Sequence, residues 1–227
     1  MEFFIRSDGK KIPLITKPYC EICSLPLDQS KSFKYCYWCQ KDEHDYPFDY
    51  IRTVEYYFKR DFQPQHVLSN EIRRFKINSS LAPLLGECLV HVIENNYMEL
   101  RKFDLIASVP KATKSRPFDQ AALLANHVSS QVGIPYHDLL YVKEEYPPLI
   151  DKDHNERTQI IRDKIGCRTK LRGESIILID DVCSSKSTMV ECARVLKIHG
   201  AGKVVGLVIG RNVDNIHLDT VGRTYES

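Results

Sequence analysis

Apolar residues recur with two different periods along this chain of 227 residues. Over residues 69–95 they return every three to four positions, which predicts an amphipathic helix, or two helices with a break near Ser79 and Ser80. Beyond Asn96, short apolar runs alternate with helical stretches. The short runs predict strands at residues 104–110, 139–142, 175–179 and 203–209. The stretches between them predict helices at 117–132 and 187–199, each followed by a glycine.

This alternation of strands and helices predicts an α/β fold. Parallel strands joined by right-handed crossovers form a sheet that helices cover on both faces, and ligands bind at the carboxyl ends of its strands. Residues 47–65 are aromatic and charged, and we interpret them as a strand or hairpin; the polar residues 143–172 predict a long loop with one helical piece. We expect three parts: a small N-terminal module (1–50), a connector with a helix (51–100) and the main domain (101–227).

The composition excludes several classes of protein. Hydrophobic residues make up 43% and charged residues 27% of the chain, a balance typical of a globular domain with a core. No apolar run approaches the roughly 18 residues of a membrane-spanning helix, and no apolar signal region opens the chain, so we expect a cytoplasmic protein that does not contact a membrane. The net charge is only +2, so an anionic ligand would have to be held by a local group of residues.

Four cysteines near the N-terminus form two C-x-x-C pairs, Cys20 with Cys23 and Cys36 with Cys39. Each pair turns two thiolates toward one point, and two pairs complete the tetrahedral ligand set of a zinc site. Four protein ligands leave no position for water, so we predict a structural rather than a catalytic zinc ion. The alternatives are packing cysteines, redox-active pairs and a ligand set that includes His44.

Basic and aromatic residues surround these cysteines: Lys31, Lys34, Tyr35, Tyr37 and Trp38. Such residues stack on bases and contact phosphates in proteins that bind single-stranded nucleic acid. They also provide the small hydrophobic packing that a metal knuckle needs, and we favour this second interpretation. Single-stranded DNA is the alternative partner.

The strongest chemical signal follows the strand predicted at 175–179. Asp180 and Asp181 come directly after the apolar run, and a segment rich in hydroxyls leads into the next helix. Backbone N–H groups at the start of a helix, together with such hydroxyls, form a cradle for phosphate. The carboxylates suit the hydroxyls of a sugar beside that phosphate, or a magnesium ion bound to it. These features describe a phosphorylated pentose as ligand; an exposed strand end is the alternative.

Residues 176–188 resemble the motif with which type I phosphoribosyltransferases bind phosphoribosyl pyrophosphate (PRPP). That motif is an apolar strand, two acids, two apolar residues, two hydroxyl residues, a glycine, any residue and a hydroxyl residue. The chain fits at every position except Lys186, which replaces the glycine. Residues 186–188 are also similar to the end of a Walker A loop, but the upstream glycine of that loop is absent.

More widely, from about Tyr19 to Arg211, the chain resembles the ComF family of phosphoribosyltransferases. That family places a four-cysteine zinc module before the transferase domain, as here. Its Arg-Gly-Phe-Asn-Gln segment is matched in part by Arg116-Pro117-Phe118-Asp119-Gln120. The resemblance implies a type I phosphoribosyltransferase-like sheet, PRPP bound with magnesium, transfer of phosphoribose to a nitrogenous base, and a link to DNA uptake.

The resemblance also implies the residues of the site. Asp180 and Asp181 would be the catalytic carboxylates. The residues that bind the ligand would be Cys183, Ser184, Ser185, Lys186, Ser187, Thr188, Lys111, Lys114 and Arg116. The last three belong to the loop that meets the pyrophosphate, although a solvated basic turn is the alternative. A mobile loop that closes over PRPP would contain Lys152, Arg157, Arg162 and Lys164.

Three departures from the family bear on activity. Lys186 lacks glycine's freedom at positive φ, which costs an ordinary residue about 1–2 kcal/mol, so either the loop is reshaped or its ammonium adds charge to the anion site. The loop after Pro110 is short and has lost arginines, and Ile160 stands where the family has asparagine. Binding of PRPP is therefore better supported than turnover. The alternative function is a sensor of PRPP or a nucleotide, joined to a zinc module that binds single-stranded DNA or a protein.

Overall fold

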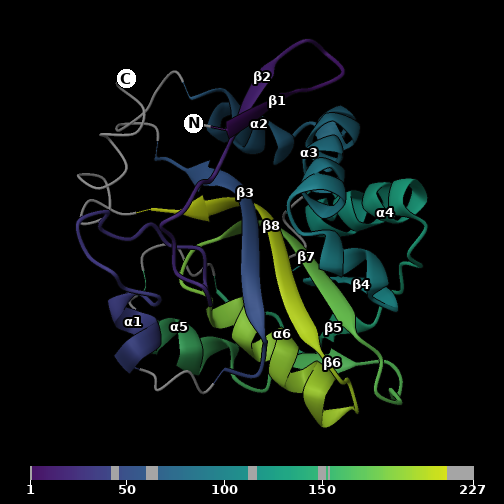
Figure 1. Ribbon diagram of the computed structural model, residues 1–227. Coiled ribbons are helices and arrows are strands. Elements are labelled where there is room, and N and C mark those ends of the chain that lie inside the picture. The colour runs from purple at the N-terminus through teal and green to yellow at the C-terminus, as the bar shows by residue number, and fades with distance from the viewer. Residues whose placement is uncertain are drawn as a thin grey trace.

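The computed structural model describes residues 2–41, 46–59, 66–111, 117–147, 152 and 154–213 (Figure 1). Its centre is a four-stranded parallel sheet with the order β3-β8-β7-β4. These strands are β3 (Tyr50–Tyr57), β8 (Val204–Asn212), β7 (Ile176–Cys183) and β4 (Leu105–Ser108). Tyr136 extends the sheet beyond β4 through a parallel bridge to Ile106. The parallel sheet predicted from the sequence is confirmed.

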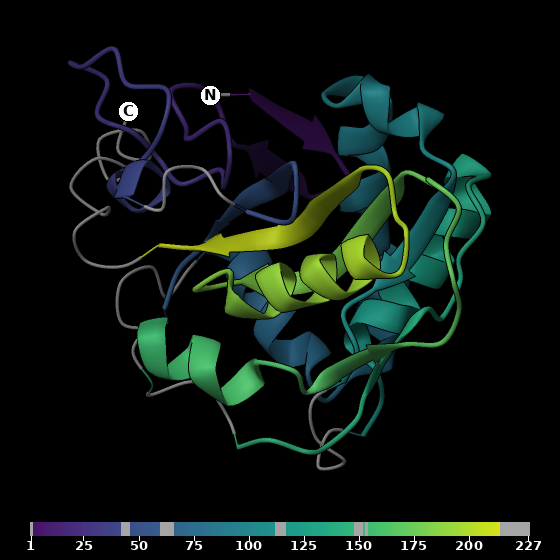
Figure 2. The same ribbon diagram turned by 90° about the horizontal axis from the view of Figure 1, so that it is seen from below.

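Helices cover both faces of this sheet (Figure 2). Neighbouring residues of a strand project to opposite faces, so Ile177 and Ile179 of β7 enter one core, while Ile176 and Leu178 enter the other. The first core is closed by α2 (Val67–Phe75), α3 (Ala82–Asn95) and α4 (Gln120–Val132). The second is closed mainly by α6 (Ser187–Ile198). The α/β fold class is therefore confirmed, and no helix in the described ranges is long and apolar enough to cross a membrane.

The helix boundaries follow local signals in the sequence. Between α2 and α3 the chain turns through a short 3-10 helix, η1 (Ser79–Leu81), which Asn78 caps by accepting a hydrogen bond from the Ser80 N–H. The predicted break near Ser79 and Ser80 is thus confirmed. A second 3-10 helix, η2 (Met98–Lys102), leads from α3 to β4. Helix α4 ends at Gly133, whose φ of 77° is the left-handed conformation that favours glycine there.

Several strands lie where the sequence pattern gave no clear period. The antiparallel hairpin of β1 (Glu2–Ile5) and β2 (Lys11–Leu14) is too short to show a period. Strand β6 (Ile165–Cys167) lies inside the segment expected to be a loop and pairs with β5 (Leu140–Val142). Strand β3 contains two polar residues, Thr53 and Glu55, that are fully buried. The segment 51–100, which the sequence suggested as a connector, therefore supplies an edge strand and two helices of the main core.

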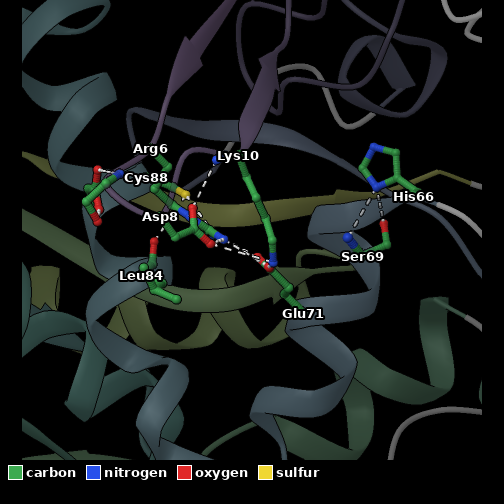
Figure 3. A network of polar contacts seen from close by, with 10 residues as sticks. Arg6, Asp8, Lys10, His66, Ser69, Glu71, Leu84 and Cys88 are labelled. Carbon is green, nitrogen blue, oxygen red and sulfur yellow. Dashed lines mark hydrogen bonds and ion pairs between the residues drawn. The ribbon is translucent and has the colours of Figure 1, made fainter.

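A buried ion network ties the N-terminal hairpin to α2 (Figure 3). The fully buried Arg6 donates two hydrogen bonds to Glu71, of 2.7 and 2.9 Å, and two to Asp8, of 2.8 and 3.0 Å. Lys10 approaches the same Glu71 carboxylate to 2.5 Å. Burial raises the pKa of Glu71, but the hydrogen bonds from Arg6 and Lys10 outweigh burial and hold it below 4.5. The hydrogen bond from Arg6 likewise lowers the pKa of Asp8 to about 2.

We expect this network to make the folded state sensitive to acid. A carboxylate whose pKa is lowered by folding stabilises the protein fully above its unfolded pKa, and this stability is lost as the pH falls through the folded pKa. The free energy of unfolding should therefore decrease as the pH is lowered below about 4.5. Glu71→Gln should lower the free energy of unfolding by about 3 kcal/mol at neutral pH, because the substitution breaks a buried ion pair. It should also make the dependence of this free energy on acidic pH shallower. Urea unfolding at several pH values measures both effects; parallel pH curves for the variant and the natural protein would contradict the assignment.

Candidate functional site

Strand β7 extends four residues past its neighbour β4. The β4–β7 pairing ends at Ser108 opposite Ile179, whereas β7 and β8 stay paired as far as Cys183 opposite Arg211. The apolar run predicted that this strand ends at residue 179. That boundary is wrong, since continued pairing with β8 keeps Asp180 and Asp181 inside the strand. The two acids therefore lie on the part of β7 that projects beyond β4, at the carboxyl edge of the sheet.

The two carboxylates have different surroundings. Asp181 is only 6% exposed and accepts a 2.8 Å hydrogen bond from the Val182 N–H. Asp180 is half-buried and accepts one of 2.8 Å from the Asp181 N–H. Burial raises the pKa of Cys192, on α6, and the charge of the Asp180 carboxylate raises it further. The two carboxylates therefore differ in burial and in the backbone N–H from which each accepts.

Residues 184–188 lead from the end of β7 into the first turn of α6 and are rich in hydroxyls; we call them the hydroxyl loop. Ser184 is exposed, Ser185 and Thr188 are half-buried, and Ser187 is buried. The Ser187 Oγ lies 3.1 Å from Ser185 Oγ and 3.3 Å from Thr158 Oγ1, which belongs to α5 (His154–Ile161). The hydroxyls and the free N–H groups of the first turn of α6 together suit a phosphate group.

Lys186 occupies the left-handed position of this loop. Its φ of 70° is the conformation for which the resembling motif uses glycine. The loop thus accepts the strain of a lysine there, which is about 1–2 kcal/mol. The side chain does not extend into the loop: the residue is 5% exposed, and its Nζ lies 3.5 Å from the Cys39 Sγ.

The remaining predicted ligand-binding residues divide into three groups. Cys183 is buried against the second core, and burial raises its thiol pKa, which fits a packing role. Lys111 is half-buried, two residues after Val109, whose N–H donates to the Ile179 carbonyl, so it lies near the same edge of the sheet. Lys114 and Arg116 lie outside the described residues, as does His44.

Three of the four basic residues predicted for the mobile loop make contacts within segment 143–172, whereas Arg162 is exposed. Lys152 pairs with Glu156 at 3.8 Å, and the Arg157 Nε donates to the Lys152 carbonyl. Lys164 pairs with Glu144. Thr158 of this segment contacts the hydroxyl loop. This contact was not predicted from the sequence, because a lone threonine on a polar helix carries no distinctive signal.

The four predicted metal ligands meet in one buried cluster, the cysteine cluster. The sulfur atoms of Cys20, Cys23, Cys36 and Cys39 all lie within 4.8 Å of one another, and Cys23 and Cys36 are 3.6 Å apart. A tetrahedral zinc site with bonds of about 2.3 Å requires sulfur separations of about 3.8 Å, so the set fits a zinc ion. The neighbouring thiols hydrogen-bond to Cys23 and, with nearby Arg211, lower its pKa despite burial, which favours the thiolate that a metal needs.

The cysteine cluster adjoins the carboxyl edge of the sheet. It packs against Tyr56 near the end of β3, against Phe58 just after β3 and against Val213 just after β8. Arg211, at the end of β8, donates from Nε to the Cys23 carbonyl at 3.0 Å and from Nη1 to the Cys183 carbonyl at 2.7 Å. The sequence analysis did not identify Arg211 as a functional residue. A single charge in an otherwise apolar run could have identified it, because a buried charge requires partners.

Aromatic side chains of the segment that carries the cysteine cluster reach its surface. Tyr37 and Trp38, in α1 (Tyr37–Lys41), are 67% and 44% exposed, and Phe33 is 52% exposed. Tyr35 packs against the core of the cysteine cluster. The packing interpretation therefore fits Tyr35, whereas Tyr37 and Trp38 leave much of their ring surface exposed.

The chain is similar to several solved structures. For an adenine phosphoribosyltransferase, the sequence identity is 15% and the TM-score 0.43, over 67% of this chain and 78% of that one. For purine phosphoribosyltransferase from Pyrococcus horikoshii, the sequence identity is 15% and the TM-score 0.38, over 57% of this chain and 83% of that one. For phosphoribosylpyrophosphate synthetase from Mycobacterium smegmatis, the sequence identity is 13% and the TM-score 0.36, over 60% of this chain but only 36% of that one.

Neither the protein-family models nor the curated protein sequences give a match to the chain. The identities and TM-scores of the solved structures are low, so no residue role is transferred from those proteins to this one.

Proposed function

We propose that this protein is a phosphoribosyltransferase of the ComF type that binds PRPP at the hydroxyl loop. The observation that supports this most strongly is the backbone of Lys186. Lys186 adopts the left-handed conformation that a glycine would favour, so the one mismatch in residues 176–188 is compatible with the backbone that the PRPP motif calls for. The N–H groups and hydroxyls of residues 184–188 would hold the 5-phosphate of the sugar.

The carboxylates would act on the ribose. Asp180 and Asp181 would accept hydrogen bonds from its hydroxyls or from water bound to magnesium. Magnesium would neutralise pyrophosphate charge. The bond between the anomeric carbon and pyrophosphate oxygen breaks, and its electron pair leaves with pyrophosphate. A ring nitrogen of the acceptor forms the new bond and loses its proton. As in phosphoryl transfer, the protein would contribute mainly positioning and electrostatic stabilisation.

The rest of the edge of the sheet would complete the site. The loop that begins at Lys111, with Lys114 and Arg116, would face the pyrophosphate, where cations stabilise the departing charge. Helix α5 lies beside the hydroxyl loop through Thr158 and would shield the reacting carbon from water. The cysteine cluster would hold a structural zinc ion, because four thiolates leave no coordination position for substrate.

The experiment that tests this activity is pyrophosphate release. The zinc-loaded protein is incubated with PRPP, magnesium and each of a panel of purine and pyrimidine bases. Release that requires both magnesium and one particular base supports transfer. Binding of PRPP without release with any base would contradict transfer and would favour the sensor.

A second candidate function is supported by the exposed aromatic residues. Tyr37 and Trp38 contact each other edge to face with ring centroids 5.3 Å apart, and the exposed Lys31 lies 5.8 Å from the Phe33 ring. Exposed rings beside cations are typical of surfaces on which unpaired bases stack. We propose single-stranded DNA as a partner of this surface.

Trp38→Ala should weaken binding of a short single-stranded oligonucleotide about tenfold, because one stacked base contributes about 1–3 kcal/mol. Zinc content should not change, since Trp38 is 44% exposed and is not one of the four clustered cysteines. Fluorescence anisotropy measures the affinity, with Met98→Ala as the control, because Met98 is an exposed apolar residue elsewhere on the surface. Equal affinities for the Trp38 variant and the control would contradict this proposal.

A further inference from the structure

Two buried cations lie between the cysteine cluster and the hydroxyl loop. Lys186 is 5% exposed and Arg211 is 2% exposed. Lys186 belongs to the loop itself, and Arg211 ends the neighbouring strand β8. Long cationic side chains are almost never this deeply buried unless something compensates their charge.

Lys186 connects the loop to a cysteine sulfur. Its ammonium lies 3.5 Å from the Cys39 Sγ and 2.5 Å from the Tyr46 Oη, and 4.2 Å from the centre of the Tyr46 ring. The backbone of the same residue adopts the left-handed turn that begins α6. A displacement of Cys39 would therefore be transmitted directly to the turn of the loop.

Arg211 connects the same two parts through backbone carbonyls. Its guanidinium donates to the carbonyl of Cys23 in the first C-x-x-C turn, and to the carbonyls of Cys183 and Ser184, where β7 passes into the loop. Among the described residues it forms no ion pair with a carboxylate. Its orientation therefore depends on the C-x-x-C turn holding its position.

The charges of these groups balance when a zinc ion is bound. A zinc ion with four thiolates carries a formal charge of −2, and Lys186 and Arg211 supply two positive charges. The metal would also hold both C-x-x-C turns at one point, so that Cys39 and the Cys23 carbonyl stay beside their cationic partners. Outer partners of this kind orient metal ligands in known sites.

We propose that Lys186 and Arg211 are positioning residues that make the conformation of the hydroxyl loop depend on zinc in the cysteine cluster. Zinc would then control a loop that supplies none of its ligands. The inference goes beyond the proposed function, because it requires only the metal and this chain.

Hydrogen exchange of the backbone amides of residues 184–190 tests the proposal, in the zinc-loaded protein and after removal of zinc with a chelator. Removal should speed exchange in this segment about tenfold or more, because charged hydrogen bonds are lost, while α3 keeps its protection as an internal reference. Lys186→Met keeps the strain at positive φ but removes the charge, and Lys186→Gly removes both. Both variants should exchange faster in the loop even with zinc bound, and should bind zinc about 10–100-fold more weakly.

Lys186→Arg should restore slow exchange, and Lys170→Met, which removes an exposed lysine, should behave as the natural protein. Loop exchange that is the same in Lys186→Met and the natural protein, both loaded with zinc, would overturn the proposal. If removal of zinc also speeds amide exchange in α3, the comparison of the zinc-loaded variants with the zinc-loaded natural protein decides whether Lys186 positions the loop. None of these measurements uses PRPP, so they stand even if PRPP fails to bind.

Discussion

Asp181→Asn is expected to reduce PRPP-dependent pyrophosphate release by about 10²–10³-fold, the usual loss when one preorganised electrostatic group is removed. The carboxylate lies almost fully buried on the part of β7 that extends past β4, and the Val182 N–H fixes one of its oxygens. Asparagine can accept the same hydrogen bond, so the fold should persist. What the substitution removes is the negative charge that would face the ribose or its magnesium-bound water.

Two further variants make this result specific. Asp180→Asn tests the neighbouring carboxylate, which is half-buried, and we expect a separate loss of activity. Glu174→Gln changes an acid just before the opposite end of the same strand and should leave release unchanged. Initial rates at saturating PRPP, with thermal unfolding as a check on folding, give the comparison. Equal rates for Asp181→Asn and Glu174→Gln would exclude a role for Asp181 in the reaction.

Loss of zinc is expected to have the largest effect on stability. Structural zinc contributes apparent folding energy on the order of 10 kcal/mol to segments too small for a core of their own. Here the segment around Cys20–Cys39 is small, and its apolar residues surround the cysteines themselves. Cys36→Ser should therefore abolish stoichiometric zinc binding and greatly speed amide exchange across residues 19–41.

The effect of Cys36→Ser is separable from the contact to Lys186, which is made by Cys39. Cys167→Ser is the matched control, because Cys167 is half-buried in β6 and belongs to no cysteine cluster in the described part of the chain. Metal analysis and hydrogen exchange on both variants measure the difference. A Cys36→Ser protein that keeps one zinc ion and the exchange pattern of the control would show that the cluster is not a zinc site.

The elements that the sequence predicted correctly depend on local signals. The apolar run of β7, the asparagine cap before η1 and the glycine after α4 each act within a few residues, so periodicity and turn chemistry are enough to predict them. The two C-x-x-C pairs predicted a cluster for the same reason, since their spacing alone brings the thiols together. Strand β3 was harder, because its buried Thr53 and Glu55 make it look polar.

The contacts between the cysteine cluster and the hydroxyl loop could not be predicted from the sequence. Lys186 and Cys39 are 147 residues apart in the chain, and Arg211 and Cys23 are 188 apart. Only the placement of the module at the carboxyl edge of the sheet brings them together. The sequence marked Lys186 as an exception to a motif, and the structure explains the exception: the left-handed backbone is kept, and the side chain leaves the loop for the cysteines.

The most direct test of the central claim, that the hydroxyl loop binds PRPP, is a calorimetric titration of the zinc-loaded protein with PRPP in the presence of magnesium. We predict saturable binding of one PRPP per chain, weakened about tenfold by Thr188→Ala through the loss of a hydrogen bond to a charged phosphate. No heat of binding, or equal affinity in the Thr188 variant, would contradict the assignment of the loop.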